Sequence, residues 1–249
     1  PTLAPRPMTP TEHIRQIADS LVEARRSGEA WSPGTFDDAL GLVEAYCVQD
    51  AVASSMGWFP SGRPSAWKAG GKPAMSAAPL PMVLASGAAW VDAVGHDLVA
   101  EAEIAVRLGR TPTSAADAAA CVATLCVSLE VVGTRLAGGL AAPAAWKLAD
   151  QGVHGVLVVG PESPWAPRDW ATQPCSLQIN DEPALHATGT HPNGDVLAPL
   201  MWLYTHALER GLPLQAGDLI TTGAWLVAPV RHGDQITVGF KGAGAVTFG

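Results

Sequence analysis

Apolar residues recur at helical spacing in two segments near the start of the chain. The first segment, residues 11–30, predicts a helix that Thr11 caps and Gly28 ends. Its apolar stripe consists of Ile14, Ile17, Leu21 and Val22. The second stripe predicts a helix from about Thr35 to Met56, and its inner face would carry Leu40, Val43, Cys47, Val48 and Val52. Neither helix carries a group of residues that could form a catalytic or metal-binding site. We therefore expect both helices to serve in packing of the core.

The segment from Leu98 to Leu108 alternates with a period of two residues, which predicts a half-buried strand. One face of this strand is apolar throughout. The opposite face carries Glu101, Glu103 and Arg107, and is therefore unusually acidic for a short strand.

The remaining patterns predict elements of both kinds. Strands are expected at residues 128–135 and 153–159, and helices at 114–126, capped by Ser114, and 195–210, ended by Gly211. Residues 57–81 and 161–174 are rich in turn-forming residues and predict loops, apart from a short strand-like piece at residues 65–71 that ends in two glycines. Residues 217–223 and 233–239 share the pattern G-D-x-I-T-x-G, in which Gly-Asp predicts a turn and the Ile/Thr alternation predicts a strand.

These elements together predict an α+β fold, with an N-terminal helical region followed by a β-rich region that contains inserted helices. The order is not a regular βαβ alternation, and the chain has neither a G-x-G-x-x-G nor a P-loop pattern. Nothing in the sequence therefore indicates a nucleotide-binding fold.

Composition narrows the class of protein further. Hydrophobic residues make up 48% of the 249 residues and charged residues 15%, which is enough apolar surface for a real core. A formal charge of −8 argues against a nucleic-acid partner, and no run of 18 apolar residues indicates a membrane span. The four cysteines form no C-x-x-C pair, so we expect reduced core residues and a cytoplasmic protein without a secretory signal.

The acidic strand face is the strongest candidate for chemistry. Glu101 and Glu103 are two residues apart on a strand, so their Cα atoms lie roughly 6–7 Å apart and their carboxylates repel each other unless a positive group intervenes. Oxygen ligands suit a hard divalent cation such as Mg²⁺ or Mn²⁺. Glu130, within the otherwise apolar SLEVV segment, is the best third ligand. The alternatives are a solvated sheet face beside Arg107 and a Glu130–Arg135 ion pair.

Four short segments resemble the fumarylacetoacetate hydrolase superfamily, in the branch of the 2-keto-4-pentenoate hydratases and 2-oxo-hex-3-enedioate decarboxylases. Residues 101–109 (EAEIAVRLG) resemble its E-x-E-I-A-x-x-L-G signature, and Trp67-Lys-Ala-Gly70 resembles its G-x-K-x-G segment. Residues 129–135 (LEVVGTR) resemble I-E-I-x-D-S-R, and residues 208–223 resemble R-G-L-x-L-x-A-G-D-x-x-x-T-G. The four segments follow each other in the family's order.

The resemblance implies a fold, a cofactor and a set of roles. The fold would be a C-terminal mixed β-roll, residues 76–249, that binds metal, after a helical region and pocket loop in residues 1–75. Glu101, Glu103 and Glu130 would bind Mg²⁺ or Mn²⁺, and a 2-oxo acid would chelate that metal through its carboxylate and 2-oxygen. Lys68 would be the catalytic proton-transfer or charge partner in the substrate pocket, and Thr222 and Gly223 would form part of the pocket wall. The resemblance also implies that the protein is a homo-oligomer and that it acts in the catabolism of aromatic compounds.

Lys68 admits two interpretations from its surroundings. A pocket lined by Trp and Gly can lower the pKa of a lysine, which would help it to move protons near neutral pH. The alternative is an ordinary surface lysine in a loop.

The chain departs from the branch pattern in three places. Gly133 stands where the pattern has Asp, and residues 150–154 (DQGVH) stand where it has D-N-x-S-S, so that Gln151 and Val153 replace polar groups and His154 is new. Residues 189–194 replace a small apolar stretch and introduce His191. The two histidines can be new acid/base groups or incidental loop residues. The lost polar groups can change the substrate, the outcome of the reaction or the activity itself.

Three hypotheses follow. The first is a lyase: a metal-dependent hydratase that adds water to a 2-hydroxydienoate, through its 2-oxo-3-enoate form, to give a 4-hydroxy-2-oxo acid. The second is a 2-oxo acid decarboxylase or tautomerase that uses the same enolate. The third is a non-catalytic homologue that associates with a partner enzyme of the pathway. Hydrolysis is less favoured, because no His-Glu pair of the superfamily's C–C hydrolases can be placed in the sequence.

Overall fold

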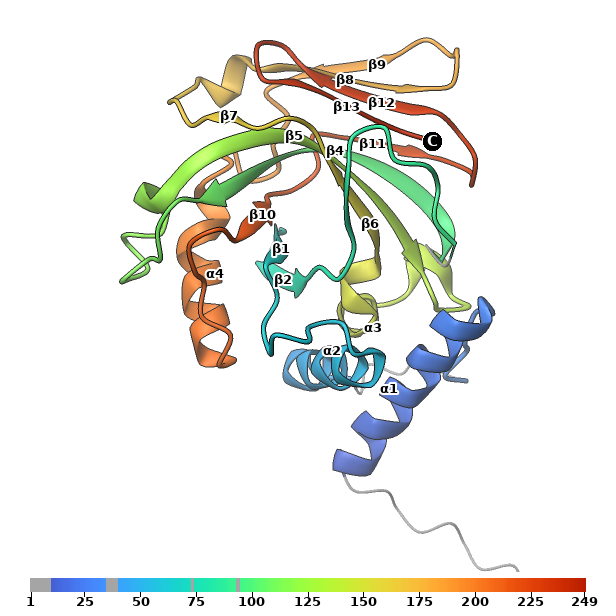
Figure 1. Cartoon of the computed structure of the whole chain (residues 1–249). Coiled ribbons are helices and arrows are strands. Elements are labelled where there is room, and N and C mark those ends of the chain that lie inside the picture. Colours follow the sequence, from blue (N-terminus) through green and yellow to red (C-terminus); the bar gives the residue numbers. More distant parts are fainter. Residues whose placement is uncertain (1–9, 35–39, 73, 93–94) are drawn as a thin grey trace, which may run out of the picture.

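The computed structural model describes residues 10–34, 40–72, 74–92 and 95–249. The α-helices are α1 (Pro10–Ser27), α2 (Leu42–Met56), α3 (Ala144–Ala149) and α4 (Ala198–Glu209), and short 3-10 helices lie at Ala119–Cys121, Gly139–Ala141, Gln151–Val153 and Trp170–Thr172. Figure 1 shows a curled central sheet with a second, smaller sheet stacked on one side of it, and the helices on the other side and at one end. The predicted α+β class is confirmed.

The larger sheet runs in the order β2-β1-β10-β4-β5-β6-β3, with β11 also pairing with β4 and β7 with β5. Its strands are β1 (Ala66–Gly70), β2 (Ser76–Pro79), β3 (Val83–Ala85), β4 (His96–Leu108), β5 (Val122–Thr134), β6 (His154–Val159), β7 (Ser163–Pro164), β10 (Leu219–Thr221) and β11 (Leu226–Pro229). The smaller sheet has the order β13-β12-β8-β9, formed by β8 (Pro174–Ile179), β9 (Leu185–Thr188), β12 (Ile236–Phe240) and β13 (Gly244–Phe248).

The long antiparallel pair of β4 and β5 lies in the middle of the large sheet. Each strand has 13 residues, and their register pairs Glu101 with Glu130. Side chains of this pair, including Ile104, Leu125 and Leu129, belong to the main apolar core, which also contains residues of the smaller sheet such as Val238 and Phe248. The long pair thus serves both as a wall of the core and as a rigid support for the acidic residues.

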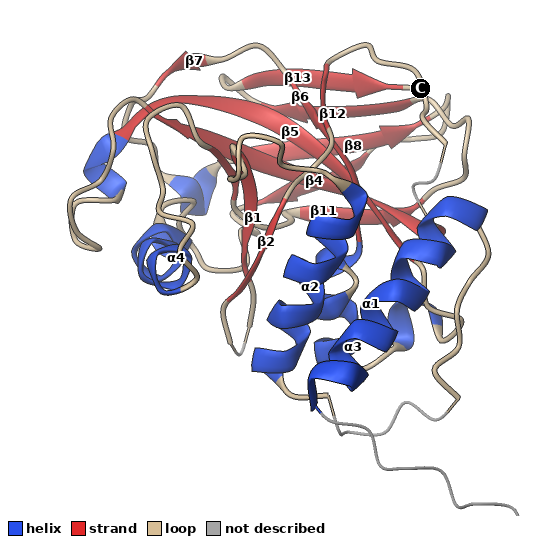
Figure 2. Ribbon diagram, turned by 60° about the horizontal axis from the view of Figure 1, so that its bottom comes forward, coloured by secondary structure: helices blue, strands red, loops and turns tan. Residues whose placement is uncertain are grey.

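The N-terminal helices form a second cluster against one end of the large sheet (Figure 2). Leu21 of α1, Val48 of α2 and Trp146 of α3 are buried together there. The apolar stripe predicted for α1 is confirmed, since Ile17, Leu21 and Val22 are buried while Ile14 is partly buried against the same cluster. Gly28 ends that helix with a positive φ of 75°, a conformation that glycine adopts without strain.

Helix α2 differs from its prediction. It begins at Leu42, and the earlier part of the predicted range, residues 35–39, lies outside the described residues. Leu40, Val48 and Val52 are buried as expected, but Val43 is 77% exposed and Cys47 is also exposed. The prediction failed because the inner face of the helix is centred on Ala45, Val48 and Val52, so Val43 and Cys47 point away from it. The other cysteines are buried, and all four are free.

The helix predicted at residues 114–126 is wrong. Ser114 Oγ does accept a hydrogen bond from the Asp117 N–H, but the segment continues as a turn and a short 3-10 helix. From Val122 onward the chain is strand β5, because pairing with β4 outweighs the helical preference of an alanine-rich segment.

Strand β4 also differs from the prediction. It was expected to be half-buried, but both of its faces are largely buried from Ala100 to Leu108.

Residues 57–81 were predicted as loops around a strand-like piece at 65–71; that piece is β1, but the segment also contains strand β2, which was not predicted. The remaining predicted elements are present with shifted ends. The strands at 128–135 and 153–159 correspond to the second part of β5 and to β6, and the helix at 195–210 is α4, which begins three residues later. Residues 161–174 are mostly irregular, although Trp170 within them is buried. The two G-D-x-I-T-x-G segments each form a turn and a strand, and those strands, β10 and β12, lie in different sheets.

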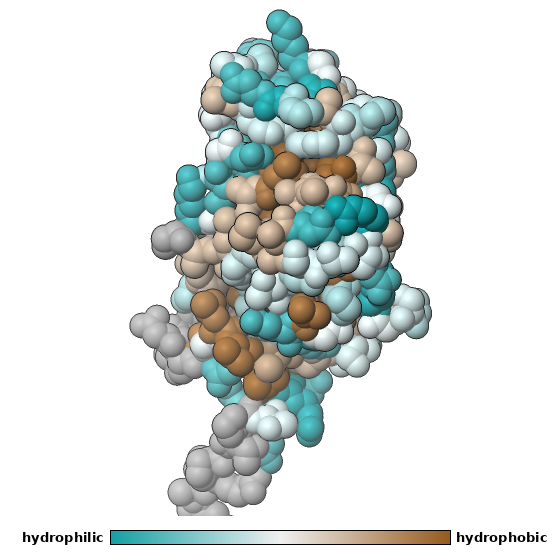
Figure 3. Space-filling view, turned by 90° about the vertical axis from the view of Figure 1, so that its left-hand side faces the viewer, coloured by the Kyte–Doolittle hydropathy of each residue, from teal (hydrophilic) through white to brown (hydrophobic). Residues whose placement is uncertain are grey.

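The face that carries α4 shows apolar patches among polar side chains (Figure 3). Helix α4 contributes two of the exposed large hydrophobic side chains, Met201 and Leu208. Within the described residues, every helix is either too short or too polar to cross a lipid bilayer.

Candidate metal centre

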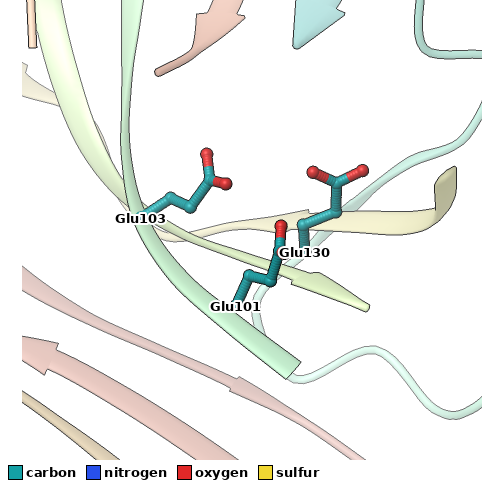
Figure 4. Close-up of side chains that lie close together, drawn as sticks. All are labelled: Glu101, Glu103 and Glu130. Carbon is teal, nitrogen blue, oxygen red and sulfur yellow. The ribbon is translucent and has the colours of Figure 1, made fainter. Parts of the chain in front are cut away.

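Three carboxylates converge on the concave side of the large sheet, as Figure 4 shows. Glu101 and Glu103 come from β4, and Glu130 comes from β5 directly opposite Glu101. One oxygen from each of the three residues lies within 4.8 Å of the other two, a spacing that suits a single metal ion. The structure therefore brings together the three acids that the sequence singled out.

The trio is not a solvated sheet face. Glu103 is 2% exposed and Glu130 is fully buried, while Glu101 is half-buried and lines a cavity. The two alternatives from the sequence are excluded as well. Arg107 pairs with Glu162 near the far end of β4, and Arg135 binds Asp150 rather than Glu130.

Burial and mutual repulsion shift the acidity of these groups. Burial, with the Glu130 carboxylate adding to it and Lys68 opposing it, raises the pKa of Glu101 to about 7. Burial, together with the carboxylates of Glu130 and Glu101, raises the pKa of Glu103 to about 8. Burial acts in the same direction on Glu130, but the Lys68 ammonium and the hydrogen bond from His154 outweigh it and hold that pKa below its usual value. Glu130 is thus the most acidic of the three carboxyl groups.

Lys68, on β1, is the cation of the site. Its Nζ lies 2.9 Å from Glu130 Oε1 and 3.1 Å from the carbonyl oxygen of Gly152. Burial alone would lower the pKa of Lys68, but the carboxylates of Glu130, Glu101 and Glu103 together raise it. The expectation of a lowered pKa is therefore wrong, because the three carboxylates together outweigh the effect of burial on the ammonium.

Glu103 is held from the other side by the last residue of β10 and the segment that follows it. Both the Thr221 hydroxyl and the Gly223 N–H donate to its Oε2, the latter over 3.1 Å. Gly223 lines the cavity, whereas Thr222 is buried and its hydroxyl donates to the Ile104 carbonyl over 2.9 Å. Thr221 was not foreseen, because the sequence pattern does not show which of two consecutive threonines faces β4.

Glu101 and Glu103 line a cavity of about 710 Å³, with Lys68 beside them at its charged end. The rest is lined mainly by apolar side chains from α2, α3, the 3-10 helix Gly139–Ala141 and the large sheet, among them Leu42, Tyr46, Val99, Val132, Leu140 and Leu148. Such a cavity, apolar with a few convergent charged groups, is typical of small-molecule sites in proteins.

Neither of the new histidines lines this cavity. His154, the first residue of β6, is 1% exposed, and its Nδ1 lies 2.8 Å from Glu130 Oε1. His191 is 5% exposed; its Nε2 lies 3.0 Å from the Thr222 carbonyl, and its Nδ1 accepts the Asn193 N–H. His191 therefore braces the loop before α4, whereas His154 contacts one of the three acids.

Comparison with known proteins agrees with this geometry. Residues 44–248 match the family model of the fumarylacetoacetate (FAA) hydrolase C-terminal domain, so the chain belongs to the fumarylacetoacetate hydrolase family. It is 29% identical over 271 aligned positions to 2-keto-4-pentenoate hydratase of Paraburkholderia xenovorans, a match that covers 96% of this chain and 95% of that protein.

Two further similarities define the branch and the fold. The chain is 30% identical over 161 residues to 2-keto-4-pentenoate hydratase 1 of Dechloromonas aromatica, covering 59% of this chain but only 58% of that relative's length. The solved structure of 4-oxalocrotonate decarboxylase of Pseudomonas putida, complexed with magnesium and adipate, superimposes with a TM-score of 0.83 at 21% identity, covering 98% of this chain and 99% of that one. The β-roll fold expected from the resemblance is confirmed.

Proposed function

We propose that the protein is a metal-dependent lyase, a hydratase that converts a 2-hydroxydienoate, through its 2-oxo-3-enoate form, into a 4-hydroxy-2-oxo acid. The observation that carries this proposal is the convergence of Glu101, Glu103 and Glu130 at the charged end of a largely apolar cavity. Similarity to hydratases over nearly the whole chain supports the reaction class.

The residues fit a divalent cation. Among the described residues, Oε2 of Glu130 is buried without a hydrogen-bond partner, which is costly unless something else binds it. Three carboxylate oxygens at this spacing suit Mg²⁺ or Mn²⁺, which leave further positions for substrate and water. When bound, the cation would act as a Lewis acid that stabilises negative charge on the 2-oxygen of the substrate.

The side chains of the chain perform the remaining steps of the proposed reaction. Lys68 is protonated at neutral pH, so its ammonium can attract the substrate carboxylate and supply a proton to the carbon skeleton. The Gly223 N–H fixes Glu103, so the carboxylate does not rotate when the substrate binds. Gly223 itself would contribute to the wall beside the substrate. Thr222, which the resemblance placed in that wall, is buried next to it and would hold the segment in place through its hydrogen bond to the Ile104 carbonyl.

The apolar part of the cavity suits the hydrocarbon part of a dienoate. The side chains of Leu42, Val99, Val132 and Leu148 face it from two helices and two strands. They would exclude bulk water from the conjugated carbons, so that only a water molecule bound near the charged end would reach C4 of the substrate.

A decarboxylase or tautomerase is the second candidate, and a specific observation favours it. Gly133 and the Gln151–Val153 segment lack the carboxyl and hydroxyl groups that the branch pattern has at these positions, and such groups could orient a water molecule. Loss of CO₂ or movement of a proton requires the same enolate but no added water. The same metal site and the same Lys68 would serve both reactions.

The test is turnover of a 2-hydroxydienoate with Mg²⁺ or Mn²⁺, followed by ultraviolet absorbance and by NMR of the product. Hydration predicts loss of the dienoate absorbance and a new carbinol carbon at C4. Decarboxylation of a 2-oxo-3-enedioate, with a product one carbon shorter and no new hydroxyl, would replace the first proposal by the second. Absence of turnover together with absence of metal binding would favour a non-catalytic homologue, which need not keep three convergent acids.

Other predictions from the sequence extend this proposal. A cytoplasmic location, a homo-oligomeric assembly, a partner enzyme of the same pathway and the division into regions 1–75 and 76–249 remain predictions. Size-exclusion chromatography with light scattering would measure the assembly directly.

A further inference from the structure

The segment between α3 and β6 has an unusual backbone. Gln151, Gly152 and Val153 follow one another with φ values of 56°, 60° and 56°, so all three are in the left-handed region. Only the middle residue is a glycine, and a β-branched residue such as Val153 is rare in this conformation. A strained turn of this kind persists only when its surroundings hold it, and such turns cluster at functional sites.

Both ends of the turn are anchored by buried groups. Before it, the Asp150 carboxylate accepts hydrogen bonds from the Arg135 backbone N–H over 2.8 Å, from Arg135 Nε over 2.7 Å and from Arg25 over 2.9 Å. Within it, the Gln151 side-chain amide donates to the Pro79 carbonyl over 2.7 Å. Strand β6 fixes the chain directly after it. These contacts hold the turn against the large sheet.

The turn presents two groups to the candidate metal centre. The Gly152 carbonyl accepts a hydrogen bond from Lys68, and the next buried side chain, His154, reaches Glu130. Both donors on Glu130 Oε1, the Lys68 ammonium and the His154 ring, are therefore oriented by this one segment. The branch pattern has Ser at positions 153 and 154, so only in this chain does the turn place an imidazole against Glu130 Oε1.

The two oxygens of Glu130 have different surroundings. Oε1 lies 2.9 Å from Lys68 Nζ and 2.8 Å from His154 Nδ1, whereas Oε2 has no partner among the described residues. Because an ionised carboxylate only accepts hydrogen bonds, the histidine nitrogen that faces it must carry the hydrogen. With Oε1 engaged twice and Oε2 buried without a partner among the described residues, Oε2 is available to bind a cation beside Glu101 and Glu103. Figure 4 shows the three carboxylates close together.

We propose that His154 is a positioning residue that holds Oε1 of Glu130 through Nδ1–H and so directs Oε2 at the metal, an inference that rests on the proposed metal site. It is not a catalytic residue, since it does not line the cavity and its ring is buried behind Glu130. A partner of this kind fixes the orientation of a ligand and its loss lowers metal affinity. The branch pattern has a serine at this position, so the supporting contact from an imidazole is a feature of this chain.

A matched pair of variants tests the proposal. Asn and Leu have nearly the same shape, but only Asn can place an N–H donor where the imidazole Nδ1–H lies. Mn²⁺ affinity is measured by electron paramagnetic resonance for the wild type, His154→Asn and His154→Leu. We expect His154→Leu to bind Mn²⁺ roughly 10–100-fold more weakly, and His154→Asn to recover most of the loss. Equal affinity in all three proteins, or equal losses in both variants, would overturn the proposal.

Circular dichroism melting of each variant controls for folding, because His154 is buried. If a variant does not fold, the wild-type protein still decides the matter. NMR of ¹⁵N-histidine-labelled protein identifies which ring nitrogen carries the hydrogen, with and without Mg²⁺. We expect His154 as the Nδ1–H tautomer in both states, with a chemical-shift change on Mg²⁺ addition. An Nε2–H tautomer, or a His154 signal indifferent to saturating Mg²⁺, contradicts the proposal.

The same measurements separate this inference from the proposed function. Failure of the wild type to bind Mn²⁺ at all would remove the metal site and the proposed function with it. Tight binding by the wild type with no dependence on the donor at position 154 would remove only the positioning role of His154.

Discussion

Glu101 and Glu130 lie directly opposite each other in the register of β4 and β5, so two carboxylates that would repel each other occupy neighbouring positions on one face of the sheet. Glu103 adds a third from the same face. A protein of this family accepts such an arrangement because a divalent cation, when bound, turns the repulsion into coordination.

Removal of one acid should therefore have opposite effects on stability with and without metal. In the metal-free protein, Glu101→Gln relieves the repulsion and should raise the free energy of unfolding by up to about 1 kcal/mol. With saturating Mg²⁺ the same variant should be less stable than the wild type, because a ligand is lost. Thermal melting in EDTA and in Mg²⁺ measures both effects, and destabilisation in EDTA would contradict the role assigned to Glu101.

The stabilisation that Mg²⁺ gives should increase with pH. Glu101 and Glu103 have pKa values raised from 4.5 to about 7 and about 8 in the folded, metal-free protein. A carboxyl whose folded pKa is raised contributes stability that is present below its unfolded pKa and is lost as the pH rises through its folded pKa. Metal-free protein should thus lose stability between about pH 5 and pH 8, whereas bound Mg²⁺ keeps both acids ionised without that loss.

Melting temperatures measured with EDTA and with Mg²⁺ across this pH range check that expectation. The difference between the two should be small near pH 5 and largest above pH 8. A difference that stays constant, or that shrinks as the pH rises, would show that protons and Mg²⁺ do not compete for these groups.

Loss of Lys68 should separate turnover from metal binding. The ammonium is the cation that neutralises Glu130 when no metal is present, so Lys68→Met should leave Mn²⁺ affinity unchanged or increase it. Turnover should fall by about 10²–10⁴-fold, the usual contribution of a group that transfers protons in the reaction. The control is Lys147→Met: Lys147 also lines the cavity, but its Nζ donates to the Leu140 carbonyl. Equal losses of turnover in both variants would argue against a specific role for Lys68.

The buried ion pairs of Asp150 predict a stability effect away from the metal. Asp150→Asn would remove the buried carboxylate that pairs with both Arg135 and Arg25 and should lower the free energy of unfolding by about 3–5 kcal/mol. Asp117→Asn breaks the more exposed pair with Arg110, which solvent screens, and should lower it by much less. Urea unfolding of both variants provides the comparison, and similar losses in the two would contradict the assigned importance of the buried network.

The acidic site was predictable because its signals are local. A period of two residues shows that Glu101 and Glu103 share a strand face, and a lone acid in the apolar segment around Glu130 calls for a partner. The register that places Glu130 opposite Glu101 is not local and was not predicted; the resemblance to the family implied only that the three acids bind one metal.

Other parts of the structure depend on contacts between distant segments and were missed. The 114–126 segment has a helical composition but extends β5, because the partner strand β4 supplies its hydrogen bonds. The Thr221 contact to Glu103 depends on how β10 pairs with β4, and the His154 contact to Glu130 on a left-handed turn that no propensity favours. Sequence pattern alone shows that His154 is unexpected but not where it points.

A crystal structure of the protein with Mg²⁺ and oxalate, a stable mimic of a 2-oxo acid, tests the central claim most directly. We expect one Mg²⁺ bound by Glu101, Glu103 and Glu130, with two oxalate oxygens and a water molecule as its other ligands and Lys68 beside the oxalate. Electron density for Mg²⁺ and oxalate at another place, or for oxalate in this cavity with no cation among the three carboxylates, would contradict it.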